Sequence, residues 1–327
     1  MESKKNVNWG VLGTARVGLN YVIPAIQQSL NGKVVAIASR DEKKAQQIAK
    51  SFGIPNYYGD YGKLLESEDV EAVYIPLPNS LHHKWTILAA ENGKHVLCEK
   101  PLAVNVRECE EMISACKNHA VWLLEGYMYR FHPQIPRLQE ILNSGSIGRI
   151  LIVRTEYAFV GGSLEDIRYQ KGLGGGSLLD LGCYCIDVTR LLMDSEPNYL
   201  VGAANFHPEK DVDETFVGLM RFPTSKVGLF GCAFHPILRH RLEVIGDEGL
   251  VELPAAFEPG CKAEIFVRRI SRTEHVEFES TNPYRLMVEH FADCVIEDHA
   301  PLMDPTGTVG NLRAMELLQQ SARAQSG

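Results

Sequence analysis

The chain has 327 residues and a formal net charge of −8, with 45% hydrophobic and 23% charged residues. A chain of this length exceeds what one hydrophobic core usually supports, so we expect two domains. The acidic balance argues against nucleic acid as a partner, since binding to phosphate backbones requires clustered Lys and Arg. No apolar stretch of about 18 residues could span a membrane, so no membrane partner is expected.

The N-terminal residues 1–8 are polar and charged and lack the apolar core of a signal peptide. We therefore expect a cytoplasmic protein. The eight cysteines contain no C-x-x-C pair, and Cys183 and Cys185 are too close for an ordinary disulfide. Free and mostly buried thiols are expected at Cys98, Cys109, Cys116, Cys183, Cys185, Cys232, Cys261 and Cys294.

The first third of the chain alternates β-branched runs with segments of helical periodicity, which predicts a parallel sheet with crossover helices. The expected strands are Val7–Leu12, Lys33–Ala38, Tyr57–Tyr58, Ala72–Ile75, His95–Cys98 and Val121–Glu125. The expected helices are Val17–Leu30, Glu42–Phe52, Lys84–Asn92 and Val106–Asn118. We expect an α/β dinucleotide-binding domain of the Rossmann type over residues 1–125.

After residue 125 the pattern changes to long alternating strands, typical of a large antiparallel sheet. The expected strands are Ile150–Val160, Phe216–Arg221, Lys226–Phe234, Arg241–Ile245, Leu250–Leu253, Ala263–Arg268 and Glu274–Glu279. The expected helices are Gln134–Asn143, Ser177–Leu192, Tyr284–Glu297 and Thr306–Ala324. Residues 126–327 are therefore expected to form an α+β domain with a mostly antiparallel sheet, which holds the substrate and carries the oligomer contacts.

A glycine-containing turn follows the first expected strand and matches the dinucleotide fingerprint, with Gly13, Ala15 and Gly18 in its three positions. Ala15 replaces the middle glycine and adds one methyl group where the pyrophosphate approaches the backbone. The helix that follows can hold a phosphate at its free N–H groups. The residues expected to contact the cofactor in this turn are Gly13, Thr14, Ala15, Arg16 and Val17.

The second expected strand ends in Ser39 and Arg40, where an NAD-binding protein usually carries an acid for the ribose 2′-hydroxyl. A serine hydroxyl and a guanidinium can instead bind a 2′-phosphate, so we expect NADP(H) in preference to NAD(H). Asp41 leaves the alternative open, because it could serve an NAD ribose or cap the next helix.

The fifth expected strand ends in Glu99-Lys100-Pro101, which places a lysine at the ligand-binding edge of a parallel sheet. Lys100 could also pair with Glu99 or extend into solvent. At this segment the chain resembles the glucose-fructose oxidoreductase, inositol dehydrogenase and MocA family, whose hallmark is Glu-Lys-Pro here. The resemblance covers essentially the whole chain and implies an NAD(P)-dependent enzyme that moves a hydride to or from a sugar-like carbon.

Three further segments carry the resemblance: residues 76–82, Arg168, and the glycine-rich string 174–187. The resemblance implies that residues 76–82 and Arg168 lie near the nicotinamide and substrate. Together with the Glu-Lys-Pro segment, they add the following residues to the expected cofactor contacts: Pro76, Leu77, Asn79, His82, Glu99, Lys100 and Arg168. Many family members have histidine where this chain has Tyr184. The tyrosine form is similar to aldose dehydrogenases, dihydrodiol dehydrogenases and sugar-ketone reductases rather than to inositol dehydrogenases.

Asp180 and Tyr184 are four residues apart in that string and should share one helix face. Reduction of a carbonyl leaves alkoxide character on the oxygen, and a positioned acid must supply a proton. We expect Tyr184 to supply it, with the Lys100 ammonium lowering the phenol pKa from its usual value of about 10. Asp180 would hold a substrate hydroxyl or orient Lys100. Alternatively, Tyr184 is a core residue and Asp180 interacts with the helix dipole.

Other candidates have weaker support. His82 and His83 are adjacent and lack a third ligand at zinc spacing, so no metal is expected. His235 and His240 could line a sugar pocket or lie in a surface loop, and the aromatic run 127–132 could shape a cleft or pack between domains. The expected pocket walls, loops 160–170 and 234–240, leave the sugar-like substrate unidentified.

Two other functions remain open alongside the oxidoreductase. The chain could be a regulatory NAD(P)-binding protein without catalysis, or a glycosidase that retains its cofactor through transient oxidation. The long C-terminal strands must also leave one sheet face available. Since similar proteins pair that face, a homodimer or homotetramer is expected.

Overall fold

The computed structural model describes residues 6–257 and 263–325. These residues form two compact units, the first from 6–128 with 284–309 and the second from 129–283 with 310–325. Residues 284–309 thus belong to the first unit, although the sequence analysis places them in the second domain. A functional domain boundary near residue 125 stays a prediction. The polar segment 1–5 and Cys261 lie outside the described residues.

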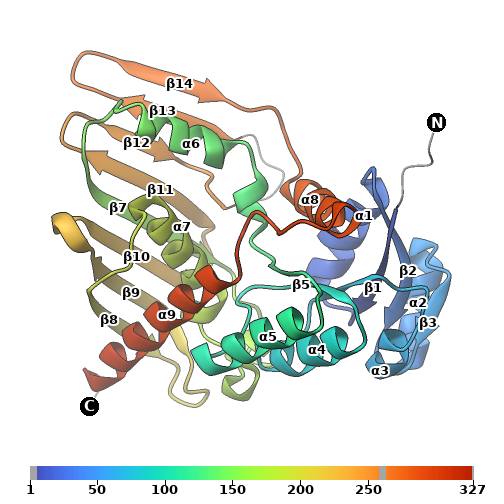
Figure 1. Ribbon diagram of the computed structural model, residues 1–327. Helices are drawn as coiled ribbons and strands as arrows, with labels where there is room; N and C mark the ends of the chain where they lie inside the picture. The colour runs from blue at the N-terminus through green and yellow to red at the C-terminus, as the bar shows by residue number, and fades with distance from the viewer. Residues whose placement is uncertain (1–5, 258–262, 326–327) are drawn as a thin grey trace, which may run out of the picture. The chain divides into compact units, whose positions relative to one another are not determined.

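The first unit is built on a six-stranded parallel sheet with the order β3-β2-β1-β4-β5-β6. This is the strand order of dinucleotide-binding Rossmann folds, and it confirms the expected fold class. Strands β1, β2, β3 and β5 are labelled in Figure 1. The strands are β1 Val7–Leu12, β2 Gly32–Ala38, β3 Asn56–Tyr58, β4 Ala72–Ile75, β5 His95–Cys98 and β6 Leu123–Glu125.

Six α-helices of the first unit flank this sheet, and local capping explains where several of them begin. Asp41 and Asn105 accept hydrogen bonds from backbone N–H groups of the first turns of α2 and α5. The helices are α1 Ile23–Gln28, α2 Glu42–Phe52, α3 Tyr61–Leu65, α4 Asn79–Glu91, α5 Val106–Asn118 and α8 Pro283–Glu297. Helix α4 begins five residues before the expected Lys84, because Pro78 ends the preceding extended segment and polar residues fill the first turn.

Helix α8 packs on the first unit although its sequence lies far from β1. The indole of Trp9 on β1 lies 5.6 Å from the ring of Phe291. The side-chain amide of Asn31 donates to the Glu289 carbonyl at 2.8 Å and to the Asp293 carboxylate at 2.7 Å. These contacts explain why a segment from the end of the chain joins the first unit.

The second unit contains an eight-stranded sheet with the order β14-β13-β12-β11-β7-β10-β9-β8 (Figure 1). All neighbours are antiparallel except β7 and β10, which confirms the expected mostly antiparallel sheet. The strands are β7 Ile150–Phe159, β8 Tyr199–Phe206, β9 Asp213–Arg221, β10 Val227–Phe234, β11 Arg239–Gly246, β12 Leu250–Leu253, β13 Glu264–Arg268 and β14 Thr273–Glu277. Strand β8 was not predicted, because its Gly202-Ala203-Ala204-Asn205 centre has little β-propensity.

Helices α6 Gln134–Asn143, α7 Cys183–Met193 and α9 Thr306–Ala324 cover one face of this sheet (Figure 1). The close approach of α9 requires glycine on β8, since a Cβ atom at Gly202 would lie 2.8 Å from the Leu318 carbonyl oxygen. The strands therefore bury one face against helices and present their alternate residues on the other.

The described cysteines are free and buried, as expected from their spacing. No described helix is long and apolar enough to cross a membrane.

A buried carboxylate at the start of β9 holds the glycine-rich turn that precedes α7. Oδ2 of Asp213 accepts from the Ser177 hydroxyl at 2.7 Å and from the Leu178 N–H at 2.6 Å. A side chain at Gly176, whose φ is +114°, would collide with Asp213. Burial raises the pKa of Asp213 to about 6 despite these donors.

The raised pKa of Asp213 predicts a specific pH dependence of stability. Because the folded-state value of about 6 exceeds the ordinary value of 3.8, folding favours the protonated acid, and its stabilising effect is lost as pH rises through 6. Between pH 4 and pH 7, wild type should lose up to about 3 kcal/mol of unfolding free energy relative to Asp213→Asn. Urea unfolding of both proteins across this range measures the difference.

Glu209→Gln is the control, because it removes an exposed negative charge from the neighbouring segment. Its unfolding free energy should follow that of wild type over the same pH range. A difference between wild type and Asp213→Asn that stays constant with pH would contradict the prediction.

Candidate functional site

The fingerprint turn in the first unit requires glycine at its first position. The Gly13 N–H donates to the Ala38 carbonyl at 2.9 Å, which ties the turn to the end of β2. Gly13 has a φ of +114°, and a Cβ atom there would lie 3.0 Å from the Leu77 side chain. Only glycine adopts this conformation without strain. Thr14, Ala15, Arg16 and Val17 complete the turn and begin the helix.

The third fingerprint glycine packs against a tyrosine that connects the cofactor turn to the segment around Lys100. A Cβ atom at Gly18 would lie 3.3 Å from the ring of Tyr74 on β4. The Tyr74 hydroxyl donates to Oε1 of Glu99 at 2.7 Å, and burial raises the pKa of this tyrosine well above its usual value. Tyr74 therefore remains a hydrogen-bond donor. The helix at Gly18 opens with a π-turn, Gly18–Val22, a feature frequent at functional sites.

The end of β2 presents a serine and an arginine beside the same turn. The buried Ser39 hydroxyl accepts from the Asp41 N–H at 3.2 Å, and the guanidinium of Arg40 interacts with the Tyr61 hydroxyl. Burial raises the pKa of Tyr61, while Arg40 opposes the shift. Oδ1 of Asp41 accepts from the Lys44 N–H at 3.2 Å, so Asp41 caps α2, which was one of its two expected roles.

The backbone on both sides of Lys100 is held by buried groups. Oε2 of Glu99 accepts from the Lys100 N–H at 3.3 Å. The Leu102 N–H donates to Oε1 of Glu125 at 2.9 Å, and the second oxygen of Glu125 accepts from the Thr308 hydroxyl at 2.6 Å. Lys100 therefore lies on a fixed segment at the carboxyl end of β5.

His82 is fully buried and connects the two loops expected near the nicotinamide. Its ring nitrogens lie 2.9 Å from the Pro101 carbonyl oxygen and 2.8 Å from that of Leu77. Burial lowers the pKa of His82, and the two carbonyls oppose this shift. The imidazole thus joins the 76–79 loop, which contains Pro76 and Asn79, to the segment after Lys100. Direct contact between His82 and a cofactor stays a prediction.

In the second unit, Asp180 lies in a π-turn, Leu178–Gly182, directly before α7. Its Oδ2 accepts from Nε of Arg168 at 2.6 Å, and Nη1 of Arg168 donates to Asp166 at 3.1 Å. These carboxylates raise the pKa of the Arg168 guanidinium, so it stays charged. The guanidinium also lies 5.1 Å from the ring centre of Phe159. The structure thus brings together two residues that the sequence analysis gave separate roles.

Tyr184 lies on α7 and is almost fully buried in an aromatic cluster. Its ring centre lies 5.3 Å from that of Tyr157, 5.5 Å from that of Phe257 and 5.8 Å from that of Tyr129. Asp180 lies in the π-turn and Tyr184 in the first turn of α7, and their expected position on one helix face stays a prediction. Lys100 belongs to the first unit and Tyr184 to the second, and their joint action stays a prediction.

Several residues of this neighbourhood were not identified from the sequence. Tyr157 and Phe257 come from strands and loops distant in sequence from Tyr184, and no local pattern marks them. Asp187, one turn after Tyr184, has the signal of an acid between the apolar residues Ile186 and Val188 of α7. His240 lies buried on β11 with its ring 6.5 Å from that of Tyr157, rather than in a surface loop.

These residues fit a bound dinucleotide. The glycine with positive φ at the turn, the helix that follows it, and the Ser39–Arg40 pair supply the positions that such a ligand requires for its pyrophosphate and 2′-phosphate.

Comparison with known families agrees with this geometry. Residues 7–127 match the family described as an oxidoreductase family with an NAD-binding Rossmann fold. Residues 135–252 match the GFO/IDH/MocA C-terminal domain. The chain is 35% identical to D-xylose 1-dehydrogenase (NADP(+)) 2 of Haloferax volcanii, over 96% of this chain and 97% of that protein. It is 31% identical to the trans-1,2-dihydrobenzene-1,2-diol dehydrogenase of Mus musculus, over 77% and 76% of the two chains.

Solved structures give the same result. A 3-ketoreductase from Actinomadura kijaniata, in complex with NADP and TDP-benzene, superposes with a TM-score of 0.92 at 26% identity, over 97% of this chain and 98% of that one. An aldose-aldose oxidoreductase from Caulobacter crescentus, complexed with glycerol, superposes with a TM-score of 0.91 at 26% identity, over 98% of both chains.

Proposed function

Because the chain belongs to the GFO/IDH/MocA family of oxidoreductases, it is an NAD(P)-dependent dehydrogenase or reductase. We propose that it moves a hydride between the nicotinamide and a hydroxyl or carbonyl carbon of a sugar, a sugar derivative or a cyclic diol. The observation that carries this proposal is the presence of three groups that can transfer a proton or stabilise a charge. Lys100 lies on a fixed segment at the carboxyl end of a parallel sheet, and Asp180 and Tyr184 lie on one helical segment.

The cofactor accepts or supplies the hydride when bound, and the protein handles the proton. Tyr184 gives a proton to the substrate oxygen during reduction and takes it back during oxidation. The ammonium of Lys100 stabilises the phenolate that remains. Arg168 holds the Asp180 carboxylate, and we expect Asp180 to hold a substrate hydroxyl or to orient Lys100.

NADP(H) is favoured over NAD(H). Ser39 and Arg40 supply a hydroxyl and a guanidinium at the end of β2, and Asp41 is engaged in capping α2. The relatives support this choice, since the D-xylose dehydrogenase is named for NADP(+) and the ketoreductase was solved with NADP. We expect the enzyme to act in the cytoplasm, where the free buried thiols would remain reduced.

Among these substrates, a cyclic diol with an apolar ring is favoured by the loops beside Arg168. The parallel strands β7 and β10 end at the paired residues Phe159 and Phe234, so the loops that follow them leave the sheet together. These loops carry exposed apolar side chains at Val160, Leu164, Ile167, Ile237 and Leu238. An apolar surface next to the Arg168–Asp180 pair suits a substrate that is polar on one side only.

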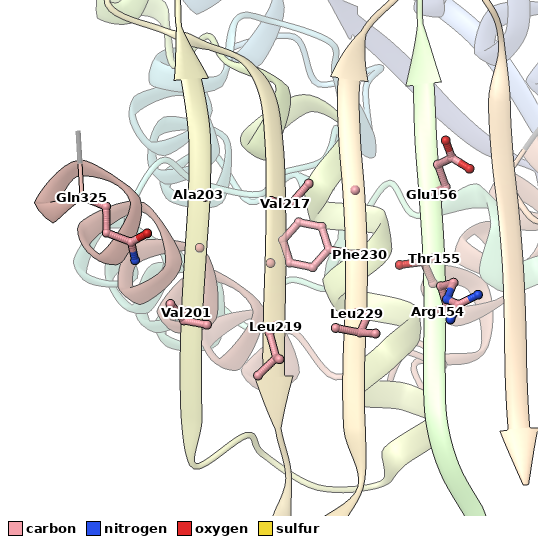
Figure 2. A pocket seen from close by; sticks show the side chains of 13 residues that line it. Arg154, Thr155, Glu156, Val201, Ala203, Val217, Leu219, Leu229, Phe230 and Gln325 are labelled. Carbon is pink, nitrogen blue, oxygen red and sulfur yellow. The ribbon is translucent and has the colours of Figure 1, made fainter.

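The open face of the eight-stranded sheet supports the proposal of a homo-oligomer. A shallow groove of about 480 Å³ crosses strands β7 to β10 on this face (Figure 2). Two cross-strand rows form its floor, Val201–Leu219–Leu229 and Ala203–Val217–Gly231. Arg154 and Glu156 on β7 border it (Figure 2). An apolar floor with charges of both signs at its edge is self-complementary for a two-fold interface.

The main test of the function compares wild type with Tyr184→Phe and Lys100→Met. Nicotinamide absorbance is followed in both directions with aldoses, sugar ketones and cyclic diols, using both cofactors. Tyr184→Phe removes only the hydroxyl, so cofactor affinity should persist while turnover falls by roughly 100- to 10,000-fold. Lys100→Met should be at least as damaging. The double variant should lose little beyond the worse single variant, because residues that act as one unit are non-additive.

Near wild-type turnover in Tyr184→Phe would move the acid role to another group. Wild type that binds NADP(H) but converts no substrate of the panel would favour a regulatory protein. Sugar release without net absorbance change, from a cofactor that never exchanges, would favour a glycosidase.

Cofactor preference is tested at Arg40. Arg40→Asp replaces a partner of the 2′-phosphate with a repelling carboxylate, so NADP should weaken at least about tenfold while NAD changes little. Dissociation constants of NADPH and NADH, from the fluorescence of the reduced nicotinamide, measure both effects. Lys50→Asp is the matched control, since it makes the same charge change on the last turn of α2. Equal weakening of NADP in the two variants would refute the role of Arg40.

The oligomer is tested by a charge on the open sheet face. Val217 is half-exposed on the groove floor, and Val217→Asp should convert the expected dimer or tetramer to monomer, because an unpaired carboxylate is costly in an apolar interface. Sizing with light scattering at micromolar concentration gives the masses. Ile270→Asp, in the exposed turn between β13 and β14, should leave the mass unchanged. A monomeric wild type would overturn the proposal.

A further inference from the structure

A buried ion pair lies one helical turn from Tyr184, within the second unit. Asp187 on α7 is buried, and Arg130 binds it with both arms of the guanidinium, Nε to Oδ2 at 2.8 Å and Nη2 to Oδ1 at 2.6 Å. Asn311 donates its amide to Oδ1 at 2.9 Å, and the Tyr129 hydroxyl donates to Oδ2. Each carboxylate oxygen thus accepts two hydrogen bonds, which fills its acceptor capacity.

The charges in this network are fixed. Arg130 lowers the pKa of the Asp187 carboxyl although burial alone would raise it, so the acid stays ionised. Burial and the neighbouring carboxylate raise the pKa of Tyr129 well above its usual range. Tyr129 therefore remains a donor to Asp187, and this hydroxyl is not free to give its proton to a substrate.

The network reaches Tyr184 through the ring of Tyr129. That ring lies edge-on to Phe257 at 5.3 Å, and both rings contact Tyr184. Tyr157 stacks on Phe257 at 5.2 Å and closes the cluster from the sheet side. A rotation of the Tyr129 ring would therefore displace the packing that holds the Tyr184 ring.

We propose that Asp187, Arg130 and Tyr129 are positioning residues, which hold the aromatic cluster so that the Tyr184 hydroxyl keeps one orientation for proton transfer. None of these three residues transfers a proton in the proposed reaction. Its effect passes through the ring contacts between Tyr129 and Tyr184. This inference rests on the acid role proposed for Tyr184.

The test is a double-mutant cycle between Tyr129→Phe and Tyr184→Phe, measured on a substrate that the wild-type enzyme converts. Tyr129→Phe keeps the ring and removes its anchor to Asp187. In the wild-type background, Tyr129→Phe should lower kcat by about 10- to 100-fold, because the Tyr184 hydroxyl would be slightly misplaced. KM and the NADP dissociation constant should not change. In the Tyr184→Phe background the same substitution should lower kcat less than about twofold, since no hydroxyl remains to be positioned.

Two further variants distinguish this role from a general loss of folding. Asp187→Asn should also lower kcat and leave KM unchanged. Arg130→Lys keeps the charge but not the two-armed geometry, so its kcat should lie between those of Asp187→Asn and wild type. Thermal unfolding is followed for each protein. Tyr199→Phe is the matched control, because it removes a phenol hydroxyl from an exposed ring at the start of β8 and should leave kcat unchanged.

Equal losses from Tyr129→Phe in both backgrounds would overturn the positioning role while the acid role of Tyr184 stood. An unchanged kcat in Tyr129→Phe would overturn it as well. Full turnover in Tyr184→Phe would overturn the acid role and this inference with it.

Discussion

A carboxylate that is removed from water must be supplied with hydrogen-bond donors, and this requirement organises the surroundings of the candidate site residues. Glu99, Glu125, Asp187 and Asp213 are buried, and each accepts from named donors. Glu99 and Glu125 hold the backbone on either side of Lys100. Asp213 holds the turn before Asp180, and Asp187 lies one turn after Tyr184. The acids that anchor the structure therefore lie next to the residues proposed for chemistry.

This arrangement explains why the proposed catalytic residues can lie on short segments at the ends of regular elements. Chain ends and turns are the least restrained parts of a fold, and proton transfer tolerates little misplacement. Tyr74 on β4, Glu125 on β6 and Thr308 in the first turn of α9 restrain the Lys100 segment. Residues of β9, of η2 Met128–Phe131 and of the later part of α9 restrain the helix that carries Tyr184. Each unit thus provides its own rigid support.

The same requirement separates the roles of the tyrosines. Tyr74 and Tyr129 both donate to buried carboxylates, and burial together with these carboxylates raises their pKa values and keeps them protonated. Tyr184 is the tyrosine for which we propose proton transfer. The three phenols illustrate that residue type alone does not identify an acid, because the partner of each hydroxyl determines what it can do.

The sequence by itself determined most of the order of elements, the two kinds of sheet, the fingerprint turn and the segments that contain Lys100, Asp180 and Tyr184, but not α3 or β8. Hydrophobic periodicity and turn chemistry are local, and strands such as β1, β4 and β5 have the bounds they predict. Only the tertiary structure decided that Arg168 pairs with Asp180, that His82 joins two loops through backbone carbonyls, and that α8 packs on the first unit. It also decided which rings surround Tyr184. Most of these contacts join residues that are far apart in the chain, and those of His82 are made to backbone carbonyls. The pattern of apolar residues within one segment cannot predict either kind of contact.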